Sequence, residues 1–168
     1  MEKFKISWSS QIKVMTISIA TILILCLVYF VARAYSSPTT YSLIFLSVIG
    51  SAIILFFIGC VISYPVSIEI NNENIILKKL SGKLIIPIKE ITTIERRSNF
   101  GFDSKKFGSG GFFGFNGFFV NDAVGKYTGY VTNQNNIFWV ITENKKYTFN
   151  CDEPDKFISL IKSKMNHD

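Results

Sequence analysis

Two long apolar runs dominate the first third of the chain. Residues 14–32 and residues 41–62 contain no charged side chain. An α-helix rises about 1.5 Å per residue, so each run is long enough to cross a hydrocarbon core about 30 Å thick. We therefore expect two transmembrane helices, residues 14–35 and 41–63, which a short connection joins into an antiparallel hairpin. Residues 1–13 are then expected to form a cytoplasmic N-terminal segment.

The distribution of lysine and arginine predicts the orientation of this hairpin. Arg33 is the only basic residue in the connection, whereas three lysines precede the first run and three follow the second: Lys3, Lys5, Lys13, Lys78, Lys79 and Lys83. Basic residues concentrate on the cytoplasmic side, so both termini are predicted to be cytoplasmic. The alternative is a signal peptide cleaved after residues 32–34. It is disfavoured because the apolar run is longer than the usual 7–15 residues or so.

Beyond residue 64 the pattern changes to short segments in which apolar and polar residues alternate. Such alternation is typical of strands that bury one face. Pro87 restricts its strand to an edge or an end of a sheet, because proline cannot donate a ladder hydrogen bond. Together with short turns, these segments predict an α+β fold that is mainly β, a seven-stranded antiparallel barrel or sandwich. The predicted strands are residues 66–70, 75–80, 84–88, 91–97, 127–132, 137–142 and 146–150.

A helix is expected after the last strand. Asp152 is placed to cap it and Pro154 falls in its first turn. Phe157, Leu160 and Ile161 have the i, i+3, i+4 spacing of one apolar face. We expect this face to close one end of the barrel.

The stretch "FGSGGFFGFNGFF", residues 107–119, admits more than one interpretation. A phosphate-binding loop is disfavoured, because no helix follows and Phe113 stands where a dinucleotide fingerprint requires glycine. We interpret the glycines as a structural motif that permits positive φ, bulges and close backbone approach. The phenylalanines then fill the barrel, or alternate between its interior and a lipid interface. The glycines of this motif are Gly108, Gly110, Gly111, Gly114 and Gly117.

Catalytic chemistry has little support in this sequence. The one histidine is His167, and the three cysteines lack metal-ligand spacing. We predict no catalytic residue, no cofactor-binding residue and no metal ligand, and hence a protein that is not an enzyme. The net charge of +6 is spread along the chain, which disfavours nucleic acid as a partner. The candidates for contact with lipid or a protein partner are Lys78, Lys79, Lys83, Arg96, Arg97, Lys105 and Lys106.

Three segments carry a resemblance to a known family. They are "GSGGFFGFNG", "YTGYVTNQNNIFWVIT" and "YTFNCDEPDKFISLI". They resemble bacterial pleckstrin-homology-like (PH-like) membrane proteins that carry a two-helix transmembrane hairpin ahead of the barrel. The resemblance covers about residues 64–164.

This resemblance implies a PH-like domain over residues 64–168, in a multi-pass protein of the bacterial cytoplasmic membrane. It also implies a non-enzymatic module without a cofactor. Two functional hypotheses follow. The module is a membrane-anchored scaffold that binds a protein partner or forms a homo-oligomer, or it senses anionic lipid through its basic residues and the glycine- and phenylalanine-rich stretch.

Overall fold

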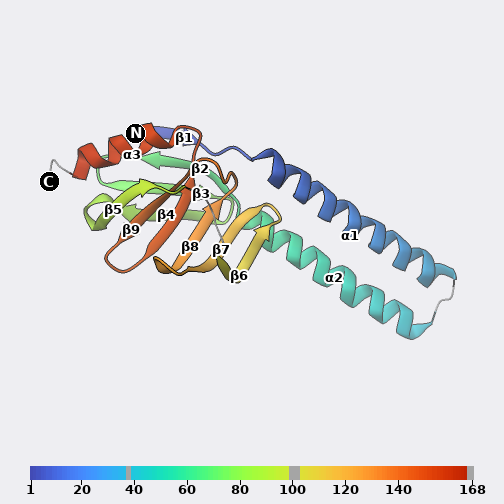
Figure 1. Cartoon of the computed structure of the whole chain (residues 1–168). Helices are drawn as coiled ribbons and strands as arrows, with labels where there is room; N and C mark the ends of the chain where they lie inside the picture. Colours follow the sequence, from blue (N-terminus) through green and yellow to red (C-terminus); the bar gives the residue numbers. More distant parts are fainter. Residues whose placement is uncertain (37–38, 99–102, 166–168) are drawn as a thin grey trace.

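The computed structural model describes residues 1–36, 39–98 and 103–165. A strand-rich domain lies at one end of the molecule, and two long helices project from it side by side (Figure 1). These are α1 (Ser10–Ser36) and α2 (Thr40–Ile62), and both are long and apolar enough to cross a membrane. We call the pair the helical hairpin. A short 3₁₀ helix, η1 (Ile88–Glu90), and α3 (Pro154–Met165) belong to the domain.

The domain contains two sheets. The first has the strand order β1 (Glu2–Lys5), β2 (Pro65–Ile70), β3 (Asn74–Lys79), β4 (Gly82–Pro87), and every pair in it is antiparallel. The second has the order β5-β9-β10-β8-β7-β6, in which only β8 and β10 pair in parallel. Its strands are β5 (Ile91–Arg96), β6 (Ser104–Gly111), β7 (Gly114–Asn121), β8 (Gly125–Val131), β9 (Ile137–Thr142) and β10 (Lys146–Asn150).

The predicted fold class, a PH-like α+β domain behind two apolar helices, is confirmed. All seven predicted strands are present, with bounds that differ by at most two residues. Pro87 ends the edge strand β4, as its missing N–H requires. The described residues contain three further strands that the sequence pattern did not reveal: β1, β6 and β7.

Strand β1 changes the interpretation of the N-terminus. Glu2–Lys5 is part of the strand-rich domain, because it pairs antiparallel with β2. Phe4 and Ile6 are buried in the core of the domain. The backbone N–H of Asp152 donates to the carbonyl of Lys5 at 3.0 Å. The helical hairpin is therefore the connection between two adjacent, hydrogen-bonded strands.

Helix α3 closes one end of the domain. Phe157 and Ile161 are fully buried, Ile158 is also buried, and Leu160 is partly buried against the same core. The Phe157 ring lies 4.8 Å from that of Phe138 and 5.1 Å from that of Phe4. This is the apolar face that the spacing predicted, with Ile158 added.

The start of α3 differs in one detail from the prediction. The helix begins at Pro154, and the N–H of Phe157 donates to the carbonyl of Glu153 at 3.0 Å. The Asp152 carboxylate accepts a hydrogen bond from Ser7 instead. Asp152 therefore ties the N-terminal segment to the domain.

Cys151 lies fully buried between β10 and α3. Burial raises the pKa of its thiol to about 12, so the thiol stays protonated near neutral pH. In a variant with Cys26→Ala and Cys60→Ala, we expect iodoacetamide to modify Cys151 only when the domain unfolds. Mass spectrometry of labelled protein measures this. A Ser159→Cys control on the exposed face of α3 should react at once, and equally fast labelling of native Cys151 would contradict the packing.

Candidate binding surface beside the helical hairpin

The turn between β6 and β7 packs against the helical hairpin. We call residues 111–114 the β6–β7 tip. The Phe112 ring stacks on Phe56 of α2 at 5.5 Å and meets Phe57 edge-on at 5.1 Å. The N–H of Phe113 donates to Thr16 Oγ1 of α1 at 3.1 Å. The tip therefore contacts both helices, close to where they leave the domain (Figure 1).

These contacts fix the depth of the tip along the helices. Thr16 lies inside the first apolar run, and Phe56 lies six residues before the end of the second run. At about 1.5 Å per residue, Phe56 is roughly 9 Å along α2 from Ile62. The tip thus lies beside the apolar part of the hairpin, at the level where a spanning hairpin enters the bilayer.

Two paired glycines allow the backbones of β6 and β7 to approach each other closely behind this tip. Gly108 of β6 and Gly117 of β7 are paired in the ladder, with φ of +121° and +137°. A Cβ on Gly108 would lie 2.1 Å from the Asn116 carbonyl oxygen, and a Cβ on Gly117 would lie 2.2 Å from that of Phe107. Both contacts are impossible for a real side chain, so the pairing requires glycine at both positions.

The three other glycines of the motif differ in whether their positions require glycine. A Cβ on Gly111 would lie 2.4 Å from Met15 Sδ of α1, and a Cβ on Gly114 would lie 2.6 Å from the Val131 carbonyl oxygen. Gly110 has no positive φ, and its Cβ would meet only the flexible side chain of Lys105 at 3.3 Å. Backbone geometry thus requires glycine at four of the five motif positions and not at Gly110.

The phenylalanines of β6 and β7 point to opposite faces. Phe119 is buried against Tyr127 in a second apolar cluster. Phe118 is 57% exposed and Phe107 is 75% exposed, and the two stand directly opposite each other in the ladder. The predicted alternation therefore holds for Phe118 and Phe119. Phe112 is buried too, but against the helical hairpin rather than inside the barrel.

An open groove of about 770 Å³ lies beside Phe118. Its apolar lining includes Tyr130, Tyr147 and Leu84, the last from edge strand β4. No aspartate or glutamate is among the described residues that line it, whereas Lys106, Lys126, Lys145 and Lys146 are. The Lys146 ammonium donates to the carbonyl of Val124. The other three lysines form no ion pair within the described part of the chain.

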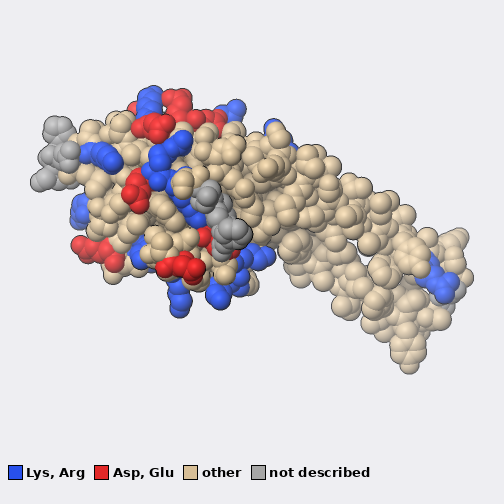
Figure 2. All heavy atoms as spheres, viewed as in Figure 1, with Lys and Arg blue, Asp and Glu red and all other residues tan. Residues whose placement is uncertain are grey.

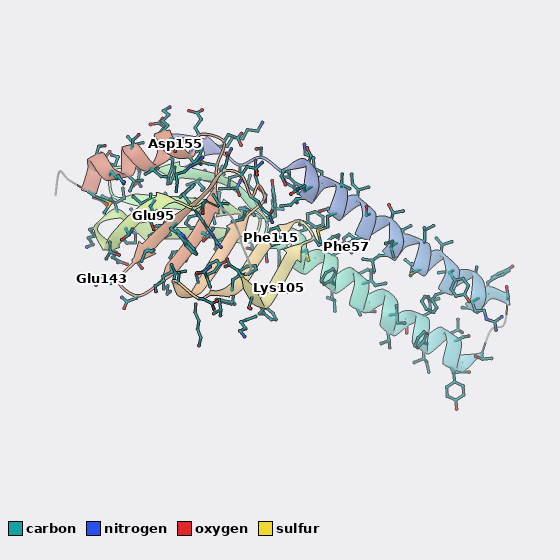
Figure 3. All side chains as sticks on the ribbon, in the orientation of Figure 1. Phe57, Glu95, Lys105, Phe115, Glu143 and Asp155 are labelled. Carbon is teal, nitrogen blue, oxygen red and sulfur yellow. The ribbon has the colours of Figure 1, made fainter. Side chains whose placement is uncertain are left out.

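Charge is distributed unevenly over the molecule. Figure 2 shows charged side chains over the domain and an almost uncharged surface along the helical hairpin. In Figure 3, Lys105 and Phe115 lie on the part of the domain next to α2, whereas Glu95, Glu143 and Asp155 lie farther from the hairpin. Lys105 of β6 thus lies on the side of the domain from which the hairpin projects.

The lysines predicted from the first β-hairpin lie near the same junction. Lys78 forms an ion pair with Glu69 at 2.6 Å, and the Lys79 ammonium lies 5.3 Å from the centre of the Tyr130 ring. Lys83 is exposed on edge strand β4. The turn that joins these strands is hydrogen-bonded to the end of α2, since the N–H of Ser81 donates to the Ile62 carbonyl at 2.9 Å.

The two predicted arginines have different environments. Arg96 is exposed and lies 3.3 Å from the Asp155 carboxylate, an arrangement that contributes little to stability. Arg97 is buried, so it cannot form part of a contact surface, contrary to the prediction. Its guanidinium bonds Asp103 and lies 4.4 Å from the centre of the Trp139 ring.

Asp103 also accepts a hydrogen bond from Tyr127, whose hydroxyl pKa is raised, mainly by burial. This cluster fastens the residues on both sides of the β5–β6 connection to the second sheet. Its role is therefore structural.

Among residues 1–36, 39–98 and 103–165, no group of three or more histidine, cysteine, aspartate or glutamate side chains could hold a metal ion. His167 lies outside the described residues. What the described site offers is an apolar floor, exposed aromatic rings and three groove lysines that form no ion pair within the described residues. Such a surface can bind an anion that also has an apolar part.

Two sheets and a closing C-terminal helix define a domain of the PH-like class. The family model for the bacterial PH domain matches residues 66–165, and the chain belongs to this family. The matched region begins directly after α2, so the helical hairpin lies outside it. No curated protein and no solved structure matches the chain. PH domains are generally non-catalytic interaction modules.

Proposed function

We propose that this chain is a membrane-anchored, non-enzymatic binding module that holds its PH domain in one fixed orientation on the cytoplasmic face of a bacterial membrane. The pairing of β1 with β2 carries this proposal. Only residues 6–9 separate β1 from α1, and only residues 63–64 separate α2 from β2. Such short connections, together with the β6–β7 tip against both helices, oppose rotation of the domain about its anchor.

The pairing also constrains topology. Residues 2–5 and the rest of the domain fold together, so they must lie on the same side of any membrane that the hairpin crosses. The lysines that flank the apolar runs favour the cytoplasmic side. A fixed orientation matters for a binding module because it presents the same face to the bilayer in every copy.

Two classes of ligand have specific support. A protein segment, or a second copy of the chain, is favoured by β4, an edge strand whose outer backbone groups are available for pairing beside the groove. This is the scaffold role. Anionic lipid is favoured by groove lysines that form no ion pair within the described residues and lie beside the exposed Phe118.

Photo-cross-linking in native membranes tests the proposal. We expect p-benzoylphenylalanine at position 118, where it replaces one aromatic ring with another, to yield discrete adducts with lipid or protein. The same probe at Ser159, on the exposed face of α3, is the control and should yield none. Mass spectrometry of the adducts identifies their class. Absence of adducts at position 118, or equal adducts at both positions, would contradict a binding role for this surface.

A further inference from the structure

The two sheets of the domain differ in width, and the wider sheet is covered only in part. Among the described residues, four strands form the first sheet and six form the second. We propose that an extended segment of another protein, apolar at one end and acidic at the other, pairs with the open edge of β4 as a further strand of the first sheet. The proposal rests on the proposed function and names the chemistry of the protein partner at the same site.

One row of paired residues across the second sheet shows where its cover ends. Paired residues on adjacent strands point to the same face of a sheet. From β6 to β9 the row consists of Phe107, Phe118, Thr128, Tyr147 and Val140. Val140 and Tyr147 are buried in the core that the two sheets share, whereas Phe118 is 57% exposed and Phe107 is 75% exposed. The first sheet therefore covers this face at β9 and β10 and leaves it open at β7 and β6.

Strand β4 borders the uncovered part of this face. It is the last strand of the first sheet, and its Leu84 lines the groove together with Phe118 and Thr128. An edge strand has an outer row of backbone N–H and C=O groups without strand partners. Pro87 cannot donate, so the groups available for pairing belong to residues 82–86. A strand added there would continue the first sheet across Phe118 and cover a ring that the existing strands leave exposed.

The lining of the groove changes along its length. Tyr130 pairs with Asn116, close to the β6–β7 tip, whereas Lys126 pairs with Val120. At about 3.3 Å per residue, Lys126 is thus roughly 13 Å farther from the tip than Tyr130. Lys145 comes just before β10, which runs parallel to β8, and so reaches the same far end. Apolar residues followed by aspartate or glutamate would complement the two ends of the groove in turn.

Other occupants fit these observations less well. The sequence of β4 is "GKLIIP", in which Lys83 is the one charged residue. Pairing of two β4 strands from two copies of the chain would therefore add positive charge to a groove whose described lining has lysines and no acidic residue. A lipid has no backbone N–H groups to pair along β4. A segment of another protein satisfies both the open edge and the charge.

Selection from a phage-displayed library of random short peptides tests the proposal. The bait is the full chain in phosphatidylcholine nanodiscs, and empty discs serve for counter-selection. We expect the enriched peptides to combine alternating apolar residues with aspartate or glutamate beyond them. The double variant Lys126→Glu, Lys145→Glu should bind these peptides severalfold more weakly. The matched control Lys89→Glu, Lys162→Glu makes the same change of net charge at exposed positions outside the groove, and it should bind them as the unaltered chain does.

Hydrogen exchange distinguishes strand addition from attraction by charge alone. Saturation with an enriched peptide should slow the exchange of amides in residues 82–86 severalfold, because N–H groups at the open edge acquire acceptors. Residues 2–5 form β1, at the opposite edge of the same sheet, and their exchange should not change. Binding that leaves residues 82–86 unaffected, or that protects both edges equally, would contradict pairing with β4.

The remaining outcomes separate this proposal from the proposed function. Enrichment of peptides without acidic residues, or of no common pattern, would overturn the proposal. So would photo-adducts at position 118 that consist mainly of lipid or of a second copy of the chain, although the binding module proposed above would then stand. Absence of any adduct at position 118 would remove that proposed function as well.

Discussion

Gly117→Ala is expected to lower the free energy of unfolding of the domain by roughly 3 kcal/mol or more, since strained φ and a backbone clash add together. Gly117 has a φ of +137°, and its Cβ would lie 2.2 Å from the Phe107 carbonyl oxygen. Relief of that clash requires β6 to separate from β7. The separation would in turn withdraw the β6–β7 tip from the helical hairpin.

Gly110→Ala is the matched control in the same motif. Its φ is not positive and its nearest neighbour is a flexible lysine side chain, so we expect a change within about 1 kcal/mol. Denaturant titration of both variants in nanodiscs, followed by tryptophan fluorescence, measures the difference. Similar losses for the two alanines would show that glycine is needed for some reason other than local backbone geometry.

Asp103→Ala should cost about 3–5 kcal/mol, the usual effect of removing one partner from a buried ion pair. The Asp103 carboxylate and the Arg97 guanidinium are almost completely inaccessible to solvent. Without the carboxylate, Arg97 remains buried between Trp139 and Tyr127 with its charge no longer neutralised. The same denaturant titration measures this loss.

The double variant Arg97→Met, Asp103→Leu is the control, because replacement of both partners by apolar residues removes the uncompensated charge. We expect it to recover most of the stability that Asp103→Ala loses. A negligible effect of Asp103→Ala would indicate that the Arg97 side chain turns to solvent, as the sequence analysis predicted. Arg97 would then again be a candidate for contact with lipid.

The seven predicted strands were recognisable because each has its own alternating pattern and its own turn. Strand β1 has four residues, "EKFK", and its partner β2 comes sixty residues later, after the hairpin. Nothing local marks so short a strand. Strands β6 and β7 are rich in glycine, which has low strand propensity. The need for glycine at positions 108 and 117 becomes visible only when the pairing of the two strands is known.

The binding surface was predictable only in part. Lys105 and Lys106 stood out because they are adjacent in sequence, as did Arg96 and Arg97. Adjacent residues on a strand face opposite sides, and Arg97 is accordingly buried with Asp103 from beyond the next connection. Lys126 and Lys145 were not singled out, because they come from different turns and meet only through the order of β7, β8 and β10 in the sheet.

The pairing of β1 with β2 has a consequence for the order of events during synthesis. Residues 2–5 leave the ribosome first, but the strand beside which they fold is made only after both helices. Closing a loop of this length is slow compared with local pairing, and in the proposed topology the loop also crosses the bilayer twice. The first sheet can therefore be completed only after both helices of the hairpin have been synthesised. A chain whose helices fail to insert would keep an unpaired edge on β2 and leave Phe4 exposed, features by which quality-control proteases could distinguish it from a correctly inserted chain.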